Sequence, residues 1–339
     1  MQTREEPSTH EVNPVQTILD MAGMYALPRC LHVVADLGVA DVLDETQRNA
    51  ADLAQELHAD PDALSRVLRL LSAHGVFKTQ SDLFSHTPAS RLLRTDHPHS
   101  MRTFARMFGL RAFWDTQGAL QKSVRTGQVA AEEVLPGGFY AYLEADPEAS
   151  AIFNFAMAAK AQGQVAGVLG AYDFSAFETI GDIGGGRGHL LRAILQAAPS
   201  VNGVLFDLPR VIEEIRSAHS TPRLRLQSGS FFQDTLPTCD GYILMEVIHA
   251  FADPDAVAIL QAIRRAAPPD ATLLVIEQMI PDHPGPHWVK TLDIHMLALL
   301  GGRQRSLHEY VALLRRGGFA FRREVDTRAG VAILESVAV

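Results

Sequence analysis

Cysteine is scarce in this sequence, and a long apolar run is missing from it. The 339 residues include two cysteines, Cys30 and Cys239, which lie far apart. Two distant cysteines form neither a disulfide framework nor a metal-ligand spacing, so we expect no metal site and a reducing compartment. No stretch matches a membrane span, and the polar, acidic start of the chain has no signal-peptide pattern. A cytoplasmic protein without a membrane partner is the simplest expectation.

An excess of positive charge is also missing. The net charge is −9, and residues 1–150 contain 13 Lys and Arg against 20 Asp and Glu. A protein that binds nucleic acid needs cationic side chains to neutralise phosphates. The charge therefore predicts no nucleic-acid partner, and it disfavours a non-enzymatic regulator that binds DNA.

The first part of the chain has the pattern of helices followed by a hairpin. Apolar residues recur every three or four positions between residues 14 and 43. Asp60 before Pro61 is typical of a helix start, because the carboxylate caps free N–H groups and proline fits the first helical position. We expect Gly75 to end that helix and residues 76–87 to form a hairpin. This order of elements is typical of a winged helix.

Two further expectations concern the same part of the chain. Residues 1–13 are polar and aperiodic, so they predict a disordered tail. Residues 14–43 carry more apolar surface than a small winged helix can bury alone. We therefore expect a homodimer that covers this surface.

From residue 178 onward the pattern alternates between strands and helices, which predicts an α/β sheet that is mostly parallel. We expect strands at 179–183, 203–207, 224–227, 241–247, 272–277, 319–325 and 332–337. No helical segment separates the last two, so the final strand should be antiparallel.

A glycine-rich loop follows the first of these strands. Residues 182–188 read Asp-Ile-Gly-Gly-Gly-Arg-Gly and open a helix. Glycine is needed where the backbone turns sharply and approaches a ligand closely, and a helix N-terminus favours an anion. Four glycines in five residues at a strand-to-helix junction predict a nucleotide site rather than an ordinary turn.

The spacing of the glycines distinguishes between nucleotides. A dinucleotide loop needs a further glycine where this chain has His189, and no Gly-Lys-Ser/Thr follows as in a phosphate-binding loop. Asp207 closes the next strand, where an acid accepts both ribose hydroxyls. Adenosine without phosphates but with an amino-acid carboxylate describes S-adenosylmethionine, and NAD is disfavoured.

Six motifs then occur in an order that characterises one enzyme family. They lie at residues 182–188, 206–209, 229–232, 246–253, 275–277 and 301–306. With this set the chain resembles the caffeic-acid-type O-methyltransferases, which include plant phenylpropanoid enzymes and many bacterial antibiotic-pathway enzymes. The resemblance covers about residues 14–339.

The resemblance implies a fold and its domains. It implies a class I methyltransferase fold, with a Rossmann-like sheet that binds S-adenosylmethionine, over residues 166–339. Residues 14–100 would be the winged-helix-like dimerisation domain of a homodimer, and residues 101–165 a helical linker and substrate lid. The implied cofactor-binding residues are Asp182, Gly184, Gly186, Asp207, Leu208, Ser230 and Phe231.

The implied reaction is transfer of a methyl group to a phenolic oxygen. A phenol has a pKa of about 10, so a base must remove its proton during the attack. His249 follows a strand at the carboxyl edge of the sheet, where ligands bind in α/β folds, and the resemblance assigns it as the base. The resemblance also assigns Glu277 and Gln304 as the residues that flank the imidazole.

The chain departs from the family at four positions. The family usually has His-Asp-Trp-x-Asp where this chain has His249-Ala250-Phe251-Ala252-Asp253. Gln304 replaces a second glutamate, and glutamine cannot stabilise imidazolium by charge. Ser230 replaces an acid that contacts adenine. These changes affect proton abstraction more than cofactor binding.

An aromatic small molecule, from bacterial secondary metabolism, is the expected substrate. The stretch 89–160 is rich in aromatic residues, which as a group could line a pocket for a flat ligand, although core packing is the simpler role for each one. By resemblance the substrate-binding residues are Trp114, Phe139, Phe153, Asn154, Met157, His295, Met296 and Leu299.

The altered motif around His249 and Gln304 leaves an alternative open. The same fold and cofactor could serve methylation of nitrogen or carbon, or a reaction without methyl transfer.

Overall fold

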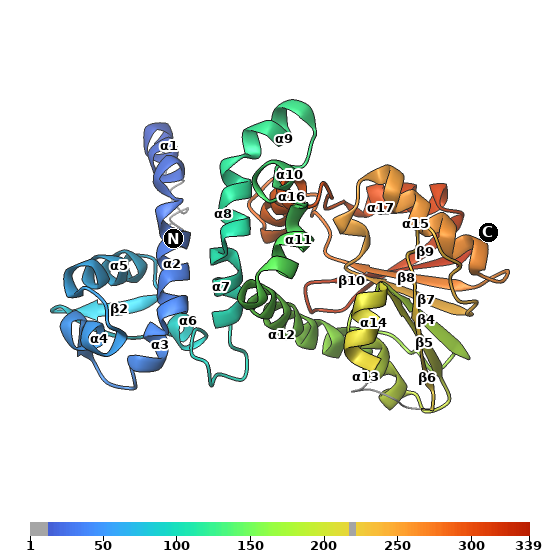
Figure 1. The fold of residues 1–339 in the computed structure, drawn as a ribbon, viewed down its shortest axis with the longest axis horizontal. Coiled ribbons are helices and arrows are strands. Elements are labelled where there is room, and N and C mark those ends of the chain that lie inside the picture. Colours follow the sequence, from blue (N-terminus) through green and yellow to red (C-terminus); the bar gives the residue numbers. More distant parts are fainter. Residues whose placement is uncertain (1–12, 217–221) are drawn as a thin grey trace, which may run out of the picture. The chain divides into compact units, whose positions relative to one another are not determined.

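The computed structural model describes residues 13–216 and 222–339. Apart from Asn13, the expected tail therefore lies outside the described residues. The chain divides into two compact units, residues 1–110 and 111–339 (Figure 1). The domain boundaries expected after residues 100 and 165 stay predictions.

Unit 1 combines helices with a small antiparallel sheet. Its elements are α1 Pro14–Gly23, α2 Ala26–Leu37, α3 Val39–Val42, β1 Arg48–Asn49, α4 Ala50–Leu57, α5 Pro61–Ala73, β2 Phe77–Gln80, β3 Leu83–His86, α6 Pro88–Arg91 and α7 Arg102–Gly109. The strand order is β1-β3-β2. The expected hairpin is thus present, and a two-residue strand too short to give a periodic pattern is added to it.

Local sequence signals explain where these helices begin and end. Asp60 accepts a hydrogen bond from the backbone N–H of Ala63 at 2.8 Å and so caps α5. Gly38 ends α2 with a φ of 73°, a left-handed conformation that glycine adopts without strain. The buried core of the unit includes Leu68, Phe77 and Phe84.

Unit 2 opens with helices and continues into the sheet. The helices before the sheet are α8 Arg111–Gly118, α9 Leu120–Thr126, α10 Ala131–Val134, α11 Gly138–Ala145 and α12 Pro147–Ala171. The strands are β4 Thr179–Ile183, β5 Asn202–Asp207, β6 Leu224–Ser228, β7 Gly241–Met245, β8 Thr272–Glu277, β9 Phe319–Asp326 and β10 Ala332–Ala338. The helices among them are α13 His189–Ala197, α14 Pro209–Arg216, the 3-10 turn η1 Ile248–Ala250, α15 Asp253–Ala266, α16 Trp288–Leu299 and α17 Leu307–Arg316.

The sheet of unit 2 has seven strands in the order β6-β5-β4-β7-β8-β10-β9. The pairs from β6 to β8 are parallel, and β10 is antiparallel to both of its neighbours. The expected mostly parallel sheet with an antiparallel last strand is confirmed.

Helices cover both faces of this sheet (Figure 1). One buried cluster joins one face to α15 and α17, and a second joins the other face to α12, α13 and α14. Helices α13, α14, α15 and α17 each contribute a stripe of apolar residues, as an amphipathic helix on a sheet must, and α12 contributes residues near its C-terminal end. None of the described helices is both long and apolar enough to cross a membrane.

The order of the strands reverses between β4 and β7. The chain runs outward from β4 through β5 and β6, then returns to β7 on the other side of β4. Ligands of open α/β sheets bind at such a switch point, beyond the carboxyl ends of the strands. The loops after β4 and β7 therefore meet at the expected binding edge.

One strand ends earlier than expected. The sequence predicts a strand over residues 241–247, but β7 ends at Met245. Glu246 has a φ of 52°, so the backbone leaves the strand there and His249 lies in the turn η1.

Candidate active site

The loop between β4 and α13 has the backbone of a close-approach site. Gly184, Gly186 and Gly188 have φ values of 70°, 58° and 69°, which favour glycine. A Cβ on Gly185 would lie 2.4 Å from the Asp182 carboxyl group, so a side chain is excluded there too. A Cβ on Gly186 would meet nothing within 4 Å. The loop therefore leaves space that a ligand can enter.

Two carboxyl groups lie at this loop. Asp182 is 1 % exposed, and its Oδ1 has no hydrogen-bond partner among the described residues. Burial, together with the nearby Asp207, raises the pKa of Asp182 to about 7. Asp207 ends β5 and accepts hydrogen bonds at 2.7 Å from the backbone N–H groups of Gly186 and Leu208. Its pKa is also raised by burial.

These residues fit the expected S-adenosylmethionine. The carboxylate of Asp207 suits a pair of ribose hydroxyls at the end of the second strand. The unpartnered oxygen of Asp182 suits an ammonium group, since a buried acceptor without a donor is costly. In the described residues no cluster of three His, Cys, Asp or Glu could hold a metal ion.

The loop after β6 contributes aromatic surface. The Ser230 N–H donates to the Asp234 carboxylate at 2.8 Å, so this loop is closed on itself. The Phe231 ring packs edge-on against Phe232 and Phe251, with centroids 4.8 and 5.6 Å apart. Phe251, which replaces the family tryptophan, thus joins an aromatic cluster beside the expected adenine-binding residues.

His249 and Glu277 form a close pair. The Nδ1 atom of His249 lies 2.7 Å from one oxygen of Glu277, and the His249 backbone N–H donates to the other oxygen at 3.2 Å. The two side chains are 13 % and 0 % exposed. A ring that directs its Nδ1–H to a carboxylate presents Nε2 as a proton acceptor.

The pKa of His249 reflects opposing effects. Burial lowers it, but the adjacent Glu277 carboxylate outweighs burial, and the pKa is raised above that of an ordinary histidine. This makes the neutral imidazole a stronger base.

The side-chain amide of Gln304 makes no hydrogen bond to this ring. Both polar atoms of its amide are buried and have no hydrogen-bond partner among the described residues. Its backbone N–H donates to the Asp293 carboxylate at 2.7 Å, which fixes the main chain instead. Its role beside the imidazole stays a prediction.

The sequence alone did not identify Arg305 as part of this region. Arg305 is 1 % exposed and donates to the carbonyl oxygens of Ile248 and Phe251 at 3.3 and 3.0 Å. It also donates to the Asp253 carboxylate at 2.7 Å. The loop that carries His249 is thus held at both sides by one guanidinium group. A role for the retained Asp253 follows from the structure, whereas sequence spacing gave no such signal.

A second group that the sequence did not identify lies at the end of β7. The Lys160 ammonium donates to the Glu246 carboxylate at 2.6 Å, and the Gln278 amide donates to the same oxygen at 2.8 Å. Lys160 belongs to α12, and the pairing joins residues that lie 86 positions apart. Only tertiary structure could have shown it.

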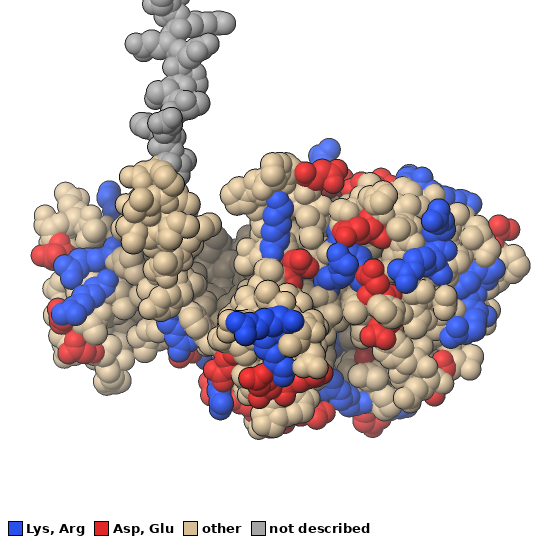
Figure 2. Space-filling model, turned by 90° about the horizontal axis from the view of Figure 1, so that it is seen from above, with Lys and Arg blue, Asp and Glu red and all other residues tan. Residues whose placement is uncertain are grey.

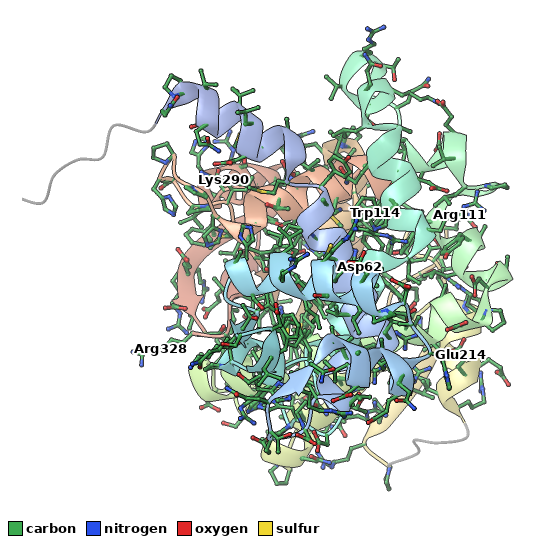
Figure 3. All side chains as sticks on the ribbon, turned by 90° about the vertical axis from the view of Figure 1, so that its left-hand side faces the viewer. Asp62, Arg111, Trp114, Glu214, Lys290 and Arg328 are labelled. Atoms are coloured by element: carbon green, nitrogen blue, oxygen red, sulfur yellow. The ribbon has the colours of Figure 1, made fainter. Side chains whose placement is uncertain are left out.

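Three of the expected substrate residues lie in one aromatic cluster. Phe113 packs edge-on against Phe139 and His295, with centroids 5.9 and 5.8 Å apart, and Phe139 packs against Phe153 at 5.3 Å. Phe113 was not among the expected site residues, although it is next to Trp114. Trp114 is half-buried on α8 (Figure 3).

The other expected substrate residues differ in their surroundings. Met296 and Leu299 are buried on α16, and Met157 is half-buried on α12. Asn154 is exposed and donates weakly to Ser150 within its own helix, at 3.5 Å. The structure therefore does not place Asn154 with the aromatic cluster.

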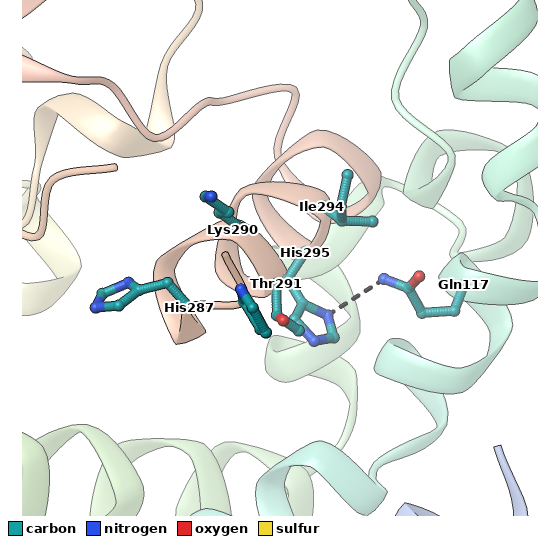
Figure 4. Close-up of a pocket in the computed structure, with 7 residues that line it drawn as sticks. Gln117, His287, Lys290, Thr291, Ile294 and His295 are labelled. Carbon is teal, nitrogen blue, oxygen red and sulfur yellow. Dashed lines mark hydrogen bonds between the residues drawn. The ribbon is translucent and has the colours of Figure 1, made fainter. Parts of the chain in front are cut away.

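A pocket of about 350 Å³ opens beside this cluster. Residues of α16 line it, with Gln117 on the opposite side (Figure 4). Gln117 and His295 are hydrogen-bonded at 3.2 Å, and burial lowers the pKa of His295 to about 4. His295 therefore belongs both to the wall of this pocket and to the aromatic cluster.

Family models match both parts of the chain. A model described as the O-methyltransferase domain matches residues 118–320, and a model described as the O-methyltransferase dimerisation domain matches residues 19–96.

Curated relatives match nearly the full chain. The phenazine O-methyltransferase of Lysobacter antibioticus is 36 % identical over 94 % of this chain and 95 % of its own length. The mitomycin biosynthesis 6-O-methyltransferase of Streptomyces lavendulae is 35 % identical over 97 % and 96 %. The 8-amino-8-demethylriboflavin N,N-dimethyltransferase of Streptomyces davaonensis is 35 % identical over 93 % of each chain.

Solved structures match the fold. The mitomycin 7-O-methyltransferase has a TM-score of 0.86 at 35 % identity, covering 96 % of this chain and 98 % of its own. A methyltransferase of calicheamicin biosynthesis with S-adenosylhomocysteine bound has a TM-score of 0.84 at 29 % identity, covering 97 % and 100 %. These findings confirm the expected resemblance, fold and cofactor. The chain belongs to the family of S-adenosylmethionine-dependent O-methyltransferases.

Proposed function

We propose that this methyltransferase acts on a phenol-like hydroxyl group of an aromatic small molecule, with His249 as the general base. The observation that carries the proposal is the pairing of His249 with Glu277 at the carboxyl edge of β7 and β8. This pairing fixes the tautomer and increases the basicity of the ring.

The proposed proton transfer uses only residues of this chain. Nε2 of His249 accepts the proton of the substrate hydroxyl as the oxygen attacks. The imidazolium that forms keeps its Nδ1–H directed at the Glu277 carboxylate, which stabilises its charge. Arg305 holds the carbonyl groups on either side of the histidine, so the ring keeps its position during the reaction.

Cofactor binding in the proposal rests on the loop after β4. S-adenosylmethionine, when bound, supplies an electrophilic methyl group. Asp207 and Leu208 would bind the ribose, Asp182 the amino-acid part, and Gly184 and Gly186 leave the backbone accessible. Ser230 and Phe231 would lie along the adenine.

The substrate class rests on the aromatic cluster and on the relatives. Edge-on rings, with Met157 and Met296 on the same helices α12 and α16, suit a flat aromatic substrate. The bacterial relatives described above are a phenazine O-methyltransferase, an O-methyltransferase of mitomycin biosynthesis and an N,N-dimethyltransferase of 8-amino-8-demethylriboflavin, so we place the substrate in bacterial secondary metabolism. Helices α8 to α12 would form the lid over it.

N-methylation of an aromatic amine is the second candidate. It is favoured by the N,N-dimethyltransferase among relatives of similar identity. An amine also loses a proton on methylation, but a neutral amine is nucleophilic before it does so. Its reaction therefore depends less on His249.

The experiment uses methyl-labelled S-adenosylmethionine with matched phenols and anilines on the same ring systems. We expect label on oxygen, and we expect His249→Ala to lower kcat by about 100-fold or more, the scale of general-base catalysis. His74→Ala, at an exposed histidine of unit 1, is the matched control. Transfer to the anilines alone, or full activity of His249→Ala, would overturn the proposal.

A further inference from the structure

A half-buried ion pair lies at the end of β7, three residues before His249. Its carboxylate, Glu246, is 16 % exposed, and its ammonium, Lys160, is 22 % exposed. The amide of Gln278, which follows Glu277 directly, donates to the same Glu246 oxygen at 2.8 Å. The carboxylate is thus fixed from two sides by residues of other elements.

This arrangement is costly for stability. A non-glycine residue with a φ of 52° lies in the left-handed region, which is strained for residues with a side chain. A half-buried ion pair gains little net stability, because both charges lose part of their water. Backbone strain that persists beside a site indicates that the strained residue has a function there.

The strand register places Glu246 at the same sheet edge as the His249–Glu277 pair. The Glu246 N–H donates to the Ile276 carbonyl at 2.9 Å, so Glu246 faces the end of β8 where Glu277 and Gln278 lie. His249 is bonded to Glu277, and Glu246 is bonded to Gln278. Glu277, the last residue of β8, thus holds the histidine, and Gln278, which follows the strand, holds the second carboxylate.

Charged groups from several elements act electrostatically on His249. Glu277 comes from β8, Glu246 from the end of β7 and Lys160 from α12. Other charged side chains near this loop are paired elsewhere, Arg305 with Asp253 and Arg303 with Glu309. Asp293 of α16 accepts from the Gln304 backbone, and buried Tyr310 of α17 lies near Glu277.

We propose that Glu246, held by Lys160 and Gln278, is a positioning residue that supplies the second negative charge beside the His249 imidazole. The family places that charge at position 304, where this chain has an uncharged glutamine. The catalytic role of Glu246 rests on the proposed function, in which His249 is the base. The electrostatic effect of Glu246 on His249 does not depend on that function.

The directions of the pKa shifts agree with this arrangement. Burial opposes the charge of His249, whereas Glu277 and then Glu246 favour it, and Lys160 opposes it. At Glu246, burial acts to raise the pKa of the carboxyl group. The positive charges of Lys160 and His249 outweigh burial, so the pKa is lowered. Lys160 therefore moderates the effect of Glu246 on the histidine.

The test is a pH titration of the His249 ring by NMR in protein with isotope-labelled histidine, assigned by the signal missing from His249→Ala. We expect Glu246→Gln to lower the pKa of His249 by about 1 unit, the scale of one nearby charge. We expect Lys160→Met to raise it, because the opposing ammonium is gone. Opposite signs cannot come from general loosening of the fold.

Glu335→Gln is the matched control, since Glu335 is a mostly buried carboxylate paired with Arg323 on β9 and β10. It should leave the His249 titration unchanged. An unchanged titration in Glu246→Gln, or shifts of the same sign in the two variants, would overturn the inference even if His249→Ala is inactive. If His249→Ala is active and the opposite shifts occur, the base role fails and the electrostatic inference stands.

Discussion

At His249, burial and a carboxylate act on one imidazole in opposite directions, and the carboxylate prevails. The ring is 13 % exposed, and its pKa is nevertheless raised because Glu277 lies 2.7 Å from Nδ1. A base works only when neutral, so its rate falls as the pH drops through the pKa. Glu277 is thus the main reason that the pKa of His249 is raised.

The first prediction follows from this contact. In the native protein we expect kcat to fall as the pH drops below the pKa of His249. This pKa is higher than that of free histidine. Glu277→Gln removes the carboxylate, so the pKa of His249 falls. The acidic limb of the profile of kcat against pH then moves to lower pH. The maximal kcat should fall by about 10- to 100-fold, because imidazolium loses its counter-charge. Single-turnover rates across pH measure both effects, and an unmoved limb would contradict the assignment.

The second prediction concerns Asp182. Burial raises its pKa to about 7, so the folded protein holds a proton that the unfolded chain, with an ordinary pKa near 4, has lost. This proton contributes stability that is present below about pH 4 and lost as the pH rises towards 7. Asp182→Asn should abolish this fall in the free energy of unfolding, as measured by urea titration.

Cofactor binding supplies a second measurement for Asp182. An ammonium group beside the carboxylate favours its ionised form, so binding of S-adenosylhomocysteine should release a proton below pH 7. Calorimetry in buffers of different ionisation enthalpy should detect this proton in the native protein and in Asp173→Asn, at an exposed carboxylate. Proton release that persists in Asp182→Asn would assign it to another group.

Among the elements, the loop from β4 to α13 has no space for a side chain at Gly185. A Cβ on Gly185 would lie 2.4 Å from Asp182 and 2.6 Å from Leu205, so it would displace the carboxyl group and the wall of the core. In contrast, Gly170 in α12 has nothing within 4 Å of a Cβ. The same substitution should therefore have opposite effects at the two positions.

The third prediction compares these glycines. Gly185→Ala should weaken S-adenosylhomocysteine binding by about 10-fold or more and destabilise the fold by about 1–3 kcal/mol, the range for overpacking. Gly170→Ala should stabilise α12 by about 0.5–1 kcal/mol, because alanine loses less entropy in a helix. Thermal unfolding and calorimetry measure both. Equal affinity in the two variants would mean that the loop adapts without cost.

At the scale of the whole molecule, unit 1 has apolar residues that its other described residues leave exposed. Val15, Ile18 and Leu19 on α1 are 66, 66 and 61 % exposed. The part of unit 1 next to the grey segment is mostly tan in Figure 2, whereas Lys and Arg lie among Asp and Glu on unit 2. The match to a dimerisation domain starts at residue 19. We propose that a second copy of the chain covers this face.

The fourth prediction tests the homodimer. Ile18→Glu would place a charge in the proposed interface, where each buried apolar side chain contributes about 1.5–3 kcal/mol. Sedimentation should show a dimer for the native chain at micromolar concentration and a shift towards monomer for this variant. Val124→Glu, at a residue of unit 2 that is 73 % exposed, should leave the dimer intact. A native monomer would contradict the proposal.

The sequence by itself determined the sheet, the cofactor loop and the family. Periodicity and glycine spacing are local, so the strands, the start of α5 at Asp60 and the loop at 182–188 could be predicted from neighbouring residues. The exceptions were elements too short for a pattern, such as β1, and the early end of β7, where the backbone turns at Glu246.

Tertiary structure alone decided which side chains meet at the site. Lys160 and Glu246 lie 86 positions apart, and Arg305 reaches the His249 loop from 57 positions away. Gln304 has the expected position in the chain, yet its amide makes no hydrogen bond to the imidazole. Contacts of this kind depend on how strands and helices pack, and no local pattern encodes the distance between their ends.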